Sequence, residues 1–172
     1  MPNPIFSGIN HLCVVTRDVD RAVRLWADKY GVGPWRVYTY ETANIEASVN
    51  GAPVAFGMRV GLCHLDPTTR IEIIQPLDDR SPYARSLEER GDADHLHHVR
   101  LDVADYGVAV GRLEGLGLDT IMSGRFEGGE PGVSSAATYM ATEQDVGFII
   151  EVSDLPPGFV MPEPDYVHPA EA

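Results

Sequence analysis

The chain contains an internal repeat, which limits the folds that it can adopt. The segment around His11 aligns with the segment around His98. In each copy a short apolar strand is followed by an aspartate suited to be a helix N-cap, Asp18 or Asp105. Apolar residues then recur at the spacing of a helix that packs on a core. The repeat therefore predicts two copies of one supersecondary unit.

Each copy continues with runs of strand-forming residues separated by turn residues. The strands expected after the helices are Trp35–Tyr40, Val54–His64 and Arg70–Gln75 in the first copy, and Leu118–Gly124, Ser135–Ala141 and Gly147–Val152 in the second. This pattern predicts an α+β fold, in which two βαβββ modules in tandem form a curved mixed sheet. A chain of 172 residues is long enough to bury the core of such a fold without a disulfide or structural metal.

We expect residues 1–154 to form one domain followed by an extended tail. The expected divisions are module one at 8–76, a linker at 77–94 with a short helix over Ala84–Glu89, module two at 95–154, and a tail at 155–172. Five prolines in the tail predict that it contains no regular element. The glycine-rich segment Glu127–Gly132 leads into a strand, which favours a hairpin loop or lid over a phosphate-binding loop.

The composition narrows the possible partners. Thirteen basic and 26 acidic residues give a net charge of −13, which disfavours binding to nucleic acid or to anionic membranes. No signal peptide or long apolar run is visible, and the two cysteines form no CxxC pair. We therefore expect a cytoplasmic protein with a small-molecule partner.

Side-chain alternation along the strands places one histidine and one glutamate of each module on the face turned away from its helix. These residues are His11 and Glu72 in module one, and His98 and Glu151 in module two. Apolar neighbours such as Cys13 share this face, so it should line a pocket in which two unpaired carboxylates would be costly. A single strand histidine is more often a hydrogen-bonded core residue, but the recurrence of the same pair favours a divalent metal site.

These residues and the repeat resemble the vicinal oxygen chelate superfamily, which includes glyoxalase I, methylmalonyl-CoA epimerase, extradiol dioxygenases and bleomycin-resistance proteins. The segment IEIIQPLDDRSPYARSLEERGDADHLHHVRLDV is most similar to methylmalonyl-CoA epimerases. Members of the superfamily pair βαβββ modules, and their metal-dependent members take ligands from the first and last strand of each module. The resemblance implies His11, Glu72, His98 and Glu151 as metal ligands, and a homodimer.

A metal-dependent isomerase, epimerase or lyase is the function that this site would support best. A divalent ion (Co, Ni, Zn, Mn or Fe) would make the proton next to a carbonyl more acidic, and Glu151 or Glu72 would move that proton. The substrate would be a small carbonyl compound or thioester. The expected substrate-binding residues are Arg100, Tyr38, Tyr40 and Tyr139. Arg100 is as well explained by an ion pair with Asp102 or Glu72.

Two other functions remain open at this stage. A ferrous dioxygenase of the extradiol type would use two histidines and one carboxylate, so a second carboxylate counts against it. A small-molecule binding or resistance protein on the same scaffold would typically lack the ligand set.

Overall fold

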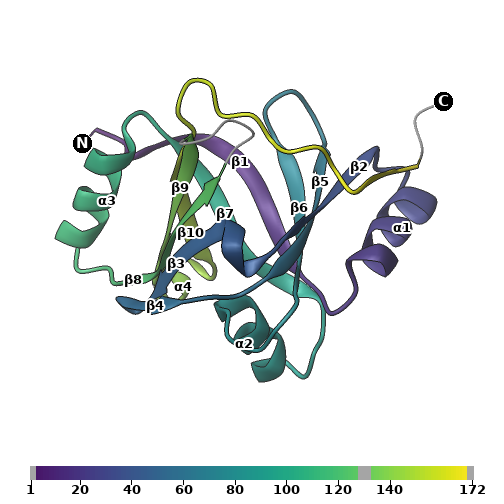
Figure 1. Cartoon of the computed structure of the whole chain (residues 1–172). Coiled ribbons are helices and arrows are strands. Elements are labelled where there is room, and N and C mark those ends of the chain that lie inside the picture. Colours follow the sequence, from purple (N-terminus) through teal and green to yellow (C-terminus); the bar gives the residue numbers. More distant parts are fainter. Residues whose placement is uncertain (1–2, 128–132, 170–172) are drawn as a thin grey trace.

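The computed structural model describes residues 3–127 and 133–169, and these form one curved sheet with helices packed on it (Figure 1). Within these residues the sheet has eleven strands in the order β11-β2-β5-β6-β1-β7-β10-β9-β8-β3-β4. No helix among them is both long and apolar enough to cross a membrane. The expected α+β fold with a curved mixed sheet is confirmed.

The two predicted modules are present as sequential units. Module one comprises β1 (Phe6–Val15), α1 (Val19–Tyr30), β2 (Trp35–Tyr40), β3 (Ile45–Val49), β4 (Ala52–Val54), β5 (Met58–His64) and β6 (Arg70–Pro76). Module two comprises β7 (His95–Val103), α3 (Tyr106–Gly115), β8 (Thr120–Glu127), β9 (Ser134–Met140), α4 (Glu143–Val146) and β10 (Ile149–Asp154). Between them lies α2 (Pro82–Glu89), where a helix over Ala84–Glu89 was expected.

The first helix of each module begins at the predicted cap. The Asp18 carboxylate accepts a hydrogen bond from the Arg21 backbone N–H at 2.9 Å, and the Asp105 carboxylate accepts one from Val108 at 2.8 Å. The α1 helix ends at Gly31, whose φ of 66° suits glycine. These local signals fix where each helix starts, and hence which of its faces meets the sheet.

The first strands of the two modules lie side by side at the centre of the sheet. Strands β1 and β7 pair antiparallel, and each pairs in parallel with the last strand of its own module, β6 or β10. Adjacent strands of a sheet hold directly opposed side chains on one face. The pairing of β1 with β7 therefore brings together the residues of both modules that lie on the sheet face turned away from the helices.

Module one contributes a hairpin that the sequence did not reveal. We expected one strand over Val54–His64, but β4 and β5 are separate strands. Strand β3 pairs with β4 through a turn at Asn50 and Gly51, which both have positive φ, and it also pairs with β8 of module two. The hairpin thus extends the sheet of the second module and carries Ile45 into the same hydrophobic core as Tyr139.

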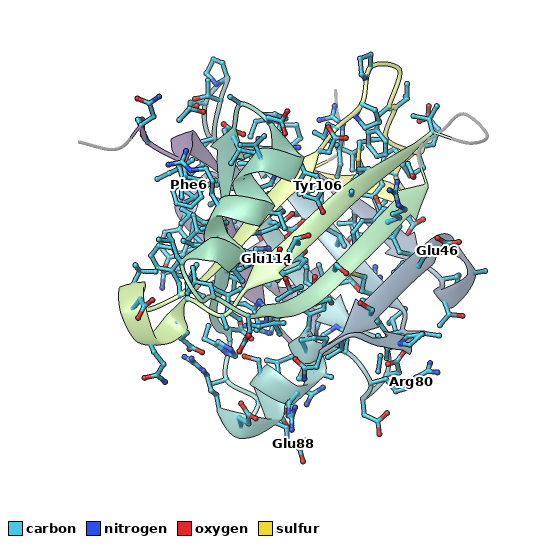
Figure 2. The ribbon with its side chains drawn as sticks, turned by 90° about the vertical axis from the view of Figure 1, so that its left-hand side faces the viewer. Phe6, Glu46, Arg80, Glu88, Tyr106 and Glu114 are labelled. Carbon is cyan, nitrogen blue, oxygen red and sulfur yellow. The ribbon has the colours of Figure 1, made fainter. Side chains whose placement is uncertain are left out.

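The two outer helices cover the convex side of the sheet, at its opposite ends (Figure 1). Helix α1 buries Val19 and Val23 against β5 and β6. Figure 2 shows α3, marked by Tyr106 and Glu114, lying across the strands of module two. The concave side encloses the core that contains Ile45 and Tyr139, so polar side chains that point into it are removed from water.

The C-terminal tail is more ordered than its prolines predict. After β10 it crosses the open side of the sheet and reaches the edge strand β2, as the yellow ribbon in Figure 1 shows. There Tyr166–His168 forms β11, which pairs antiparallel with β2. The expectation of no regular element is wrong at this point, because a free sheet edge can pair with any extended segment. The expected loop at Glu127–Gly132 has its residues 128–132 outside the described ranges.

Candidate metal centre

The four predicted ligands converge on one point in the concave face. His11 comes from β1, Glu72 from β6, His98 from β7 and Glu151 from β10. His11 Nε2 lies 3.4 Å from Glu72 Oε2 and 3.1 Å from Glu151 Oε2. His98 Nε2 lies 3.3 Å and 3.0 Å from the same two oxygens, and 3.2 Å from His11 Nε2. We call these four residues the ligand cluster.

The spacing of the four donor atoms fits a single metal ion. Bonds from a metal to nitrogen or oxygen are about 2.0–2.2 Å long, so two ligands at angles of about 90–109° lie about 2.8–3.6 Å apart. The five distances above fall within this range, and all four donor atoms lie within 4.8 Å of one another. Imidazole and carboxylate donors together suit first-row divalent metals.

The cluster is buried, and its electrostatics favour positive charge at its centre. Burial by itself would raise the pKa of Glu151, but His11 and His98 hold that pKa well below its usual value. Glu72 has a lowered pKa for the same reasons. Burial lowers the pKa of His98, yet its hydrogen bonds to both carboxylates raise it to about 9. Two buried carboxylates therefore stabilise a cation between them, whether a proton or a metal ion.

The two carboxylates are not held in the same way. Glu151 Oε2 faces the histidines, while its Oε1 accepts a hydrogen bond from Ser153 Oγ at 3.3 Å. The Glu151 side chain is 6% exposed, whereas that of Glu72 is 14% exposed. Glu72 is the carboxylate more open to the adjoining cavity.

A cavity of about 290 Å³ opens beside the ligand cluster. His11, Glu72 and Glu151 lie in its wall together with apolar side chains from both modules. The tail closes one side of it with Leu155, Phe159 and Met161. No sequence signal pointed to these tail residues, because their position depends on the pairing of β11 with β2.

Of the tyrosines expected to bind substrate, Tyr40 and Tyr139 line the cavity. The Tyr139 ring stands edge-on to His98 at a centroid distance of 5.0 Å, and its hydroxyl accepts a hydrogen bond from Tyr83. Tyr38 is not among the described residues of the cavity wall. It is buried beside Tyr40, and its placement does not support the expected contact with substrate.

Arg100 reaches the cavity, as expected, and a second arginine joins it. Among the described residues, Arg100 forms no ion pair with Asp102 or with Glu72, the two partners that would have given it a purely structural role. Arg70, on β6, also lines the cavity. Arg70 was not identified from the sequence, although it lies two residues before Glu72 and four before Ile74 on the same strand and so shares their face.

The chain is similar to a known protein family. The sequence profile of the Glyoxalase/Bleomycin resistance protein/Dioxygenase superfamily matches residues 10–136. No curated protein sequence gave a significant match.

Several solved structures share the fold at low sequence identity. Methylmalonyl-CoA epimerase from Mycobacterium tuberculosis is 19% identical with a TM-score of 0.64, over 91% of this chain and 93% of that one. A variant methylmalonyl-CoA epimerase from Streptomyces coelicolor, in complex with 2-nitronate-propionyl-CoA, is 14% identical with a TM-score of 0.62, over 87% and 98%. A protein from Bacillus halodurans, described as hypothetical, is 13% identical with a TM-score of 0.62, over 86% and 94%. At these identities the likeness concerns the fold alone.

The profile match covers most of the chain, and the tandem modules and curved sheet agree with it. The chain therefore belongs to the glyoxalase/bleomycin resistance protein/dioxygenase superfamily.

Proposed function

We propose that this protein is a metal-dependent enzyme that removes a proton from the carbon next to a carbonyl, as an epimerase, isomerase or lyase. The observation that carries the proposal is the ligand cluster, in which four donor atoms from both modules lie within 4.8 Å of one another. A bound divalent ion would supply a Lewis acid, which makes a carbon acid next to a coordinated carbonyl easier to deprotonate.

Glu151 is the base in this proposal. Its carboxylate is buried and ionised, and it borders the cavity in which a substrate carbon would lie. The hydrogen bond from Ser153 to Oε1 orients the group and leaves Oε2 directed at the cluster. A proton taken up by this carboxylate can exchange with solvent, and a proton returned from the same oxygen to the same face of the carbon exchanges the hydrogen there with retention of configuration.

Glu72 is the second candidate for proton transfer. Strands β6 and β10, which carry the two glutamates, flank the central β1–β7 pair on opposite sides. Removal of a proton by one glutamate and delivery of a different proton to the opposite face by the other, protonated glutamate would invert the configuration at carbon. Replacing Glu151 and Glu72 one at a time distinguishes the glutamate that removes the proton from the one that delivers it.

The similar structures support a carbonyl or thioester as the substrate. Several are methylmalonyl-CoA epimerases, and one is in complex with methylmalonyl-CoA. Their identity to this chain is too low to transfer the substrate itself, so the proposal is limited to the reaction type.

The first experiment measures the metal. Protein purified without added metal should contain one equivalent of a first-row divalent metal by elemental analysis, and His98→Ala should lose it. His64→Ala removes an exposed histidine on β5 and is the matched control, which should keep the metal. A metal-free wild-type protein that binds none on titration would overturn the proposal and favour a simple binding protein.

The second experiment follows the proton. Incubation with methylmalonyl-CoA and with small oxo acids in heavy water should place deuterium on the carbon next to the carbonyl. Glu151→Gln should slow this exchange by at least about a hundredfold, as expected when a general base is removed. Oxygen consumption without deuterium incorporation would indicate the dioxygenase alternative instead.

A further inference from the structure

Two arginines flank His11 within the sheet. In the register of the strands, Arg70 on β6 lies directly opposite His11 on one side, and Arg100 on β7 lies opposite it on the other. Arg100 is also the partner of Glu151 on β10. Side chains in one row across adjacent strands share a face, and all four of these residues line the cavity. The row alternates two guanidinium groups with two members of the ligand cluster.

Both guanidinium groups are available to a ligand in the cavity. Within residues 3–127 and 133–169, Arg70 and Arg100 form no ion pair, and the Arg100 side chain forms no hydrogen bond. Arg70 donates a hydrogen bond to the amide oxygen of Asn10, whose amide nitrogen donates to Asp102 at 3.0 Å. This relay positions Arg70 through the neutral amide of Asn10, which lies between it and the Asp102 carboxylate. Burial and the neighbouring Arg100 lower the pKa of Arg70, and the more weakly acting carboxylates of Glu72, Glu151 and Asp102 oppose that shift.

The charges around the cavity favour an anion. Two carboxylates and two neutral imidazoles would balance a bound divalent ion, which would leave two arginines against the one nearby carboxylate of Asp102, and so a net positive charge beside the cavity. Unpaired charges that are partly removed from water are costly, and a bound counter-charge removes that cost. The planar fork of a guanidinium group matches a carboxylate with two parallel hydrogen bonds.

The cavity is small, and the rest of its wall is mostly apolar, with hydroxyl groups from Ser135, Ser153 and three tyrosines. Met58, Val60, Leu62 and Phe126 line it from the sheet, and Phe159 and Met161 close it from the tail. Its volume of about 290 Å³ lies at the low end of small-molecule sites, which span about 300–1,000 Å³. A compact ligand with an apolar body fits this wall better than a large, highly charged one.

We propose that Arg70 and Arg100 form the carboxylate-binding end of the cavity, and that the substrate is a small oxo acid with an apolar remainder. The placement of the carbonyl at the ligand cluster rests on the proposed function. Binding of the carboxylate rests on the two arginines and on the cavity that they line.

The test compares an acid with its neutral ester. Binding of 4-methyl-2-oxopentanoate and of its methyl ester is measured by isothermal titration calorimetry, with the protein as purified and after removal of metal by a chelator. The acid should bind at least tenfold more tightly than the ester in both preparations. Equal affinity of the two compounds, or no binding of the acid at millimolar concentration, would overturn the proposal.

Variants then assign the effect to the arginines. Arg100→Gln and Arg70→Gln should each weaken binding of the acid at least tenfold and leave the ester unchanged. Arg100→Lys keeps the charge without the fork and should fall between Arg100→Gln and the wild type. Arg85→Gln removes an exposed arginine on α2 that forms an ion pair with Glu89, and it should bind the acid as the wild type does. Wild-type affinity in Arg100→Gln would refute the assignment.

Two further measurements separate this proposal from the proposed function. Elemental analysis should show the same metal content in the arginine variants as in the wild type, so loss of acid binding cannot be attributed to loss of metal. Circular dichroism should show that each variant is folded. If propionyl-CoA, whose acyl group carries no carboxylate, bound as tightly as the acid and independently of Arg100, the cavity would be a thioester site and the proposal would be wrong.

Discussion

Nδ1 of His97 lies 3.0 Å from Nδ1 of His98. Burial holds the pKa of His97 well below its ordinary value, so its ring is neutral and can accept a hydrogen bond. When His98 is neutral, donation of its Nδ1 proton to His97 would leave the lone pair on Nε2, the atom that faces the two carboxylates. His97 would thereby favour the tautomer of His98 that binds a metal.

Replacing His97 should therefore weaken metal binding although His97 is not a ligand. We expect His97→Phe to lower the affinity for a divalent metal by about 10–100-fold, the usual effect of losing such a partner. Titration against a chromophoric chelator measures this affinity. His97→Asn keeps an acceptor near the position of Nδ1 and should restore most of it. Equal losses in both variants would mean that His97 acts only through packing.

Removal of the metal should lower the thermal stability. A ligand present at about one hundred times its Kd stabilises a protein by about 2.7 kcal/mol. For a chain of this length, removing such a ligand should lower the Tm by about 5–10 °C. Differential scanning calorimetry before and after treatment with a chelator measures the change. Glu151→Gln should abolish the response, and Glu114→Gln, an exposed residue on α3 (Figure 2), should retain it. A Tm that is independent of metal in the wild type would contradict this prediction.

The convergence of the ligand cluster was predictable because it depends on two regular features. Alternation along short strands assigns His11 and Glu72 to one face, and the repeat assigns His98 and Glu151 to the equivalent face of module two. The central pairing of β1 with β7 then brings the two faces together. The same alternation places Arg70 on the face of β6 that carries Glu72, so the position of Arg70 could have been predicted too.

The hairpin and the tail could not be predicted in the same way. The Asn50-Gly51 turn is a local hairpin signal, but the pairing of β3 with β8 joins segments far apart in the chain. The pairing of β11 with β2 is made by backbone groups, which leave no pattern in the side chains. The tail supplies Leu155, Phe159 and Met161 to the cavity wall, which is why this part of the wall could not be read from the motifs.

Gly61 on β5 allows α1 to lie close to the sheet. A Cβ atom at this position would lie 3.1 Å from Val23 Cγ2 and 3.3 Å from Val19 Cγ2, and both valines are fully buried. Because neither valine has room to move, we expect Gly61→Ala to lower the free energy of unfolding by about 1–3 kcal/mol. Urea denaturation measures the loss. Gly111→Ala places its Cβ in open space on α3 and should be neutral or stabilising by up to about 1 kcal/mol.

Asp20 on α1 fastens the C-terminal tail to the sheet. Its carboxylate accepts two hydrogen bonds from Arg59, at 2.8 and 2.9 Å, and one from the Tyr166 hydroxyl of β11. The hydrogen bonds from Arg59 lower the pKa of Asp20 to about 2. Because the pair is partly exposed, we expect Asp20→Asn to lower the free energy of unfolding at neutral pH by only about 1 kcal/mol.

The pH dependence of this difference tests its cause. The pKa of Asp20 is lower in the folded protein than the ordinary 3.8, so its contribution to stability is present above pH 4 and is lost as the pH falls toward 2. Urea denaturation from pH 7 downward should therefore show the wild type and Asp20→Asn converging below about pH 4. Asp28→Asn removes a charge from the same helix at an exposed position and should show no such convergence. A difference for Asp20→Asn that stays constant to the lowest pH would mean that packing of the tail, and not the ion pair, accounts for the loss.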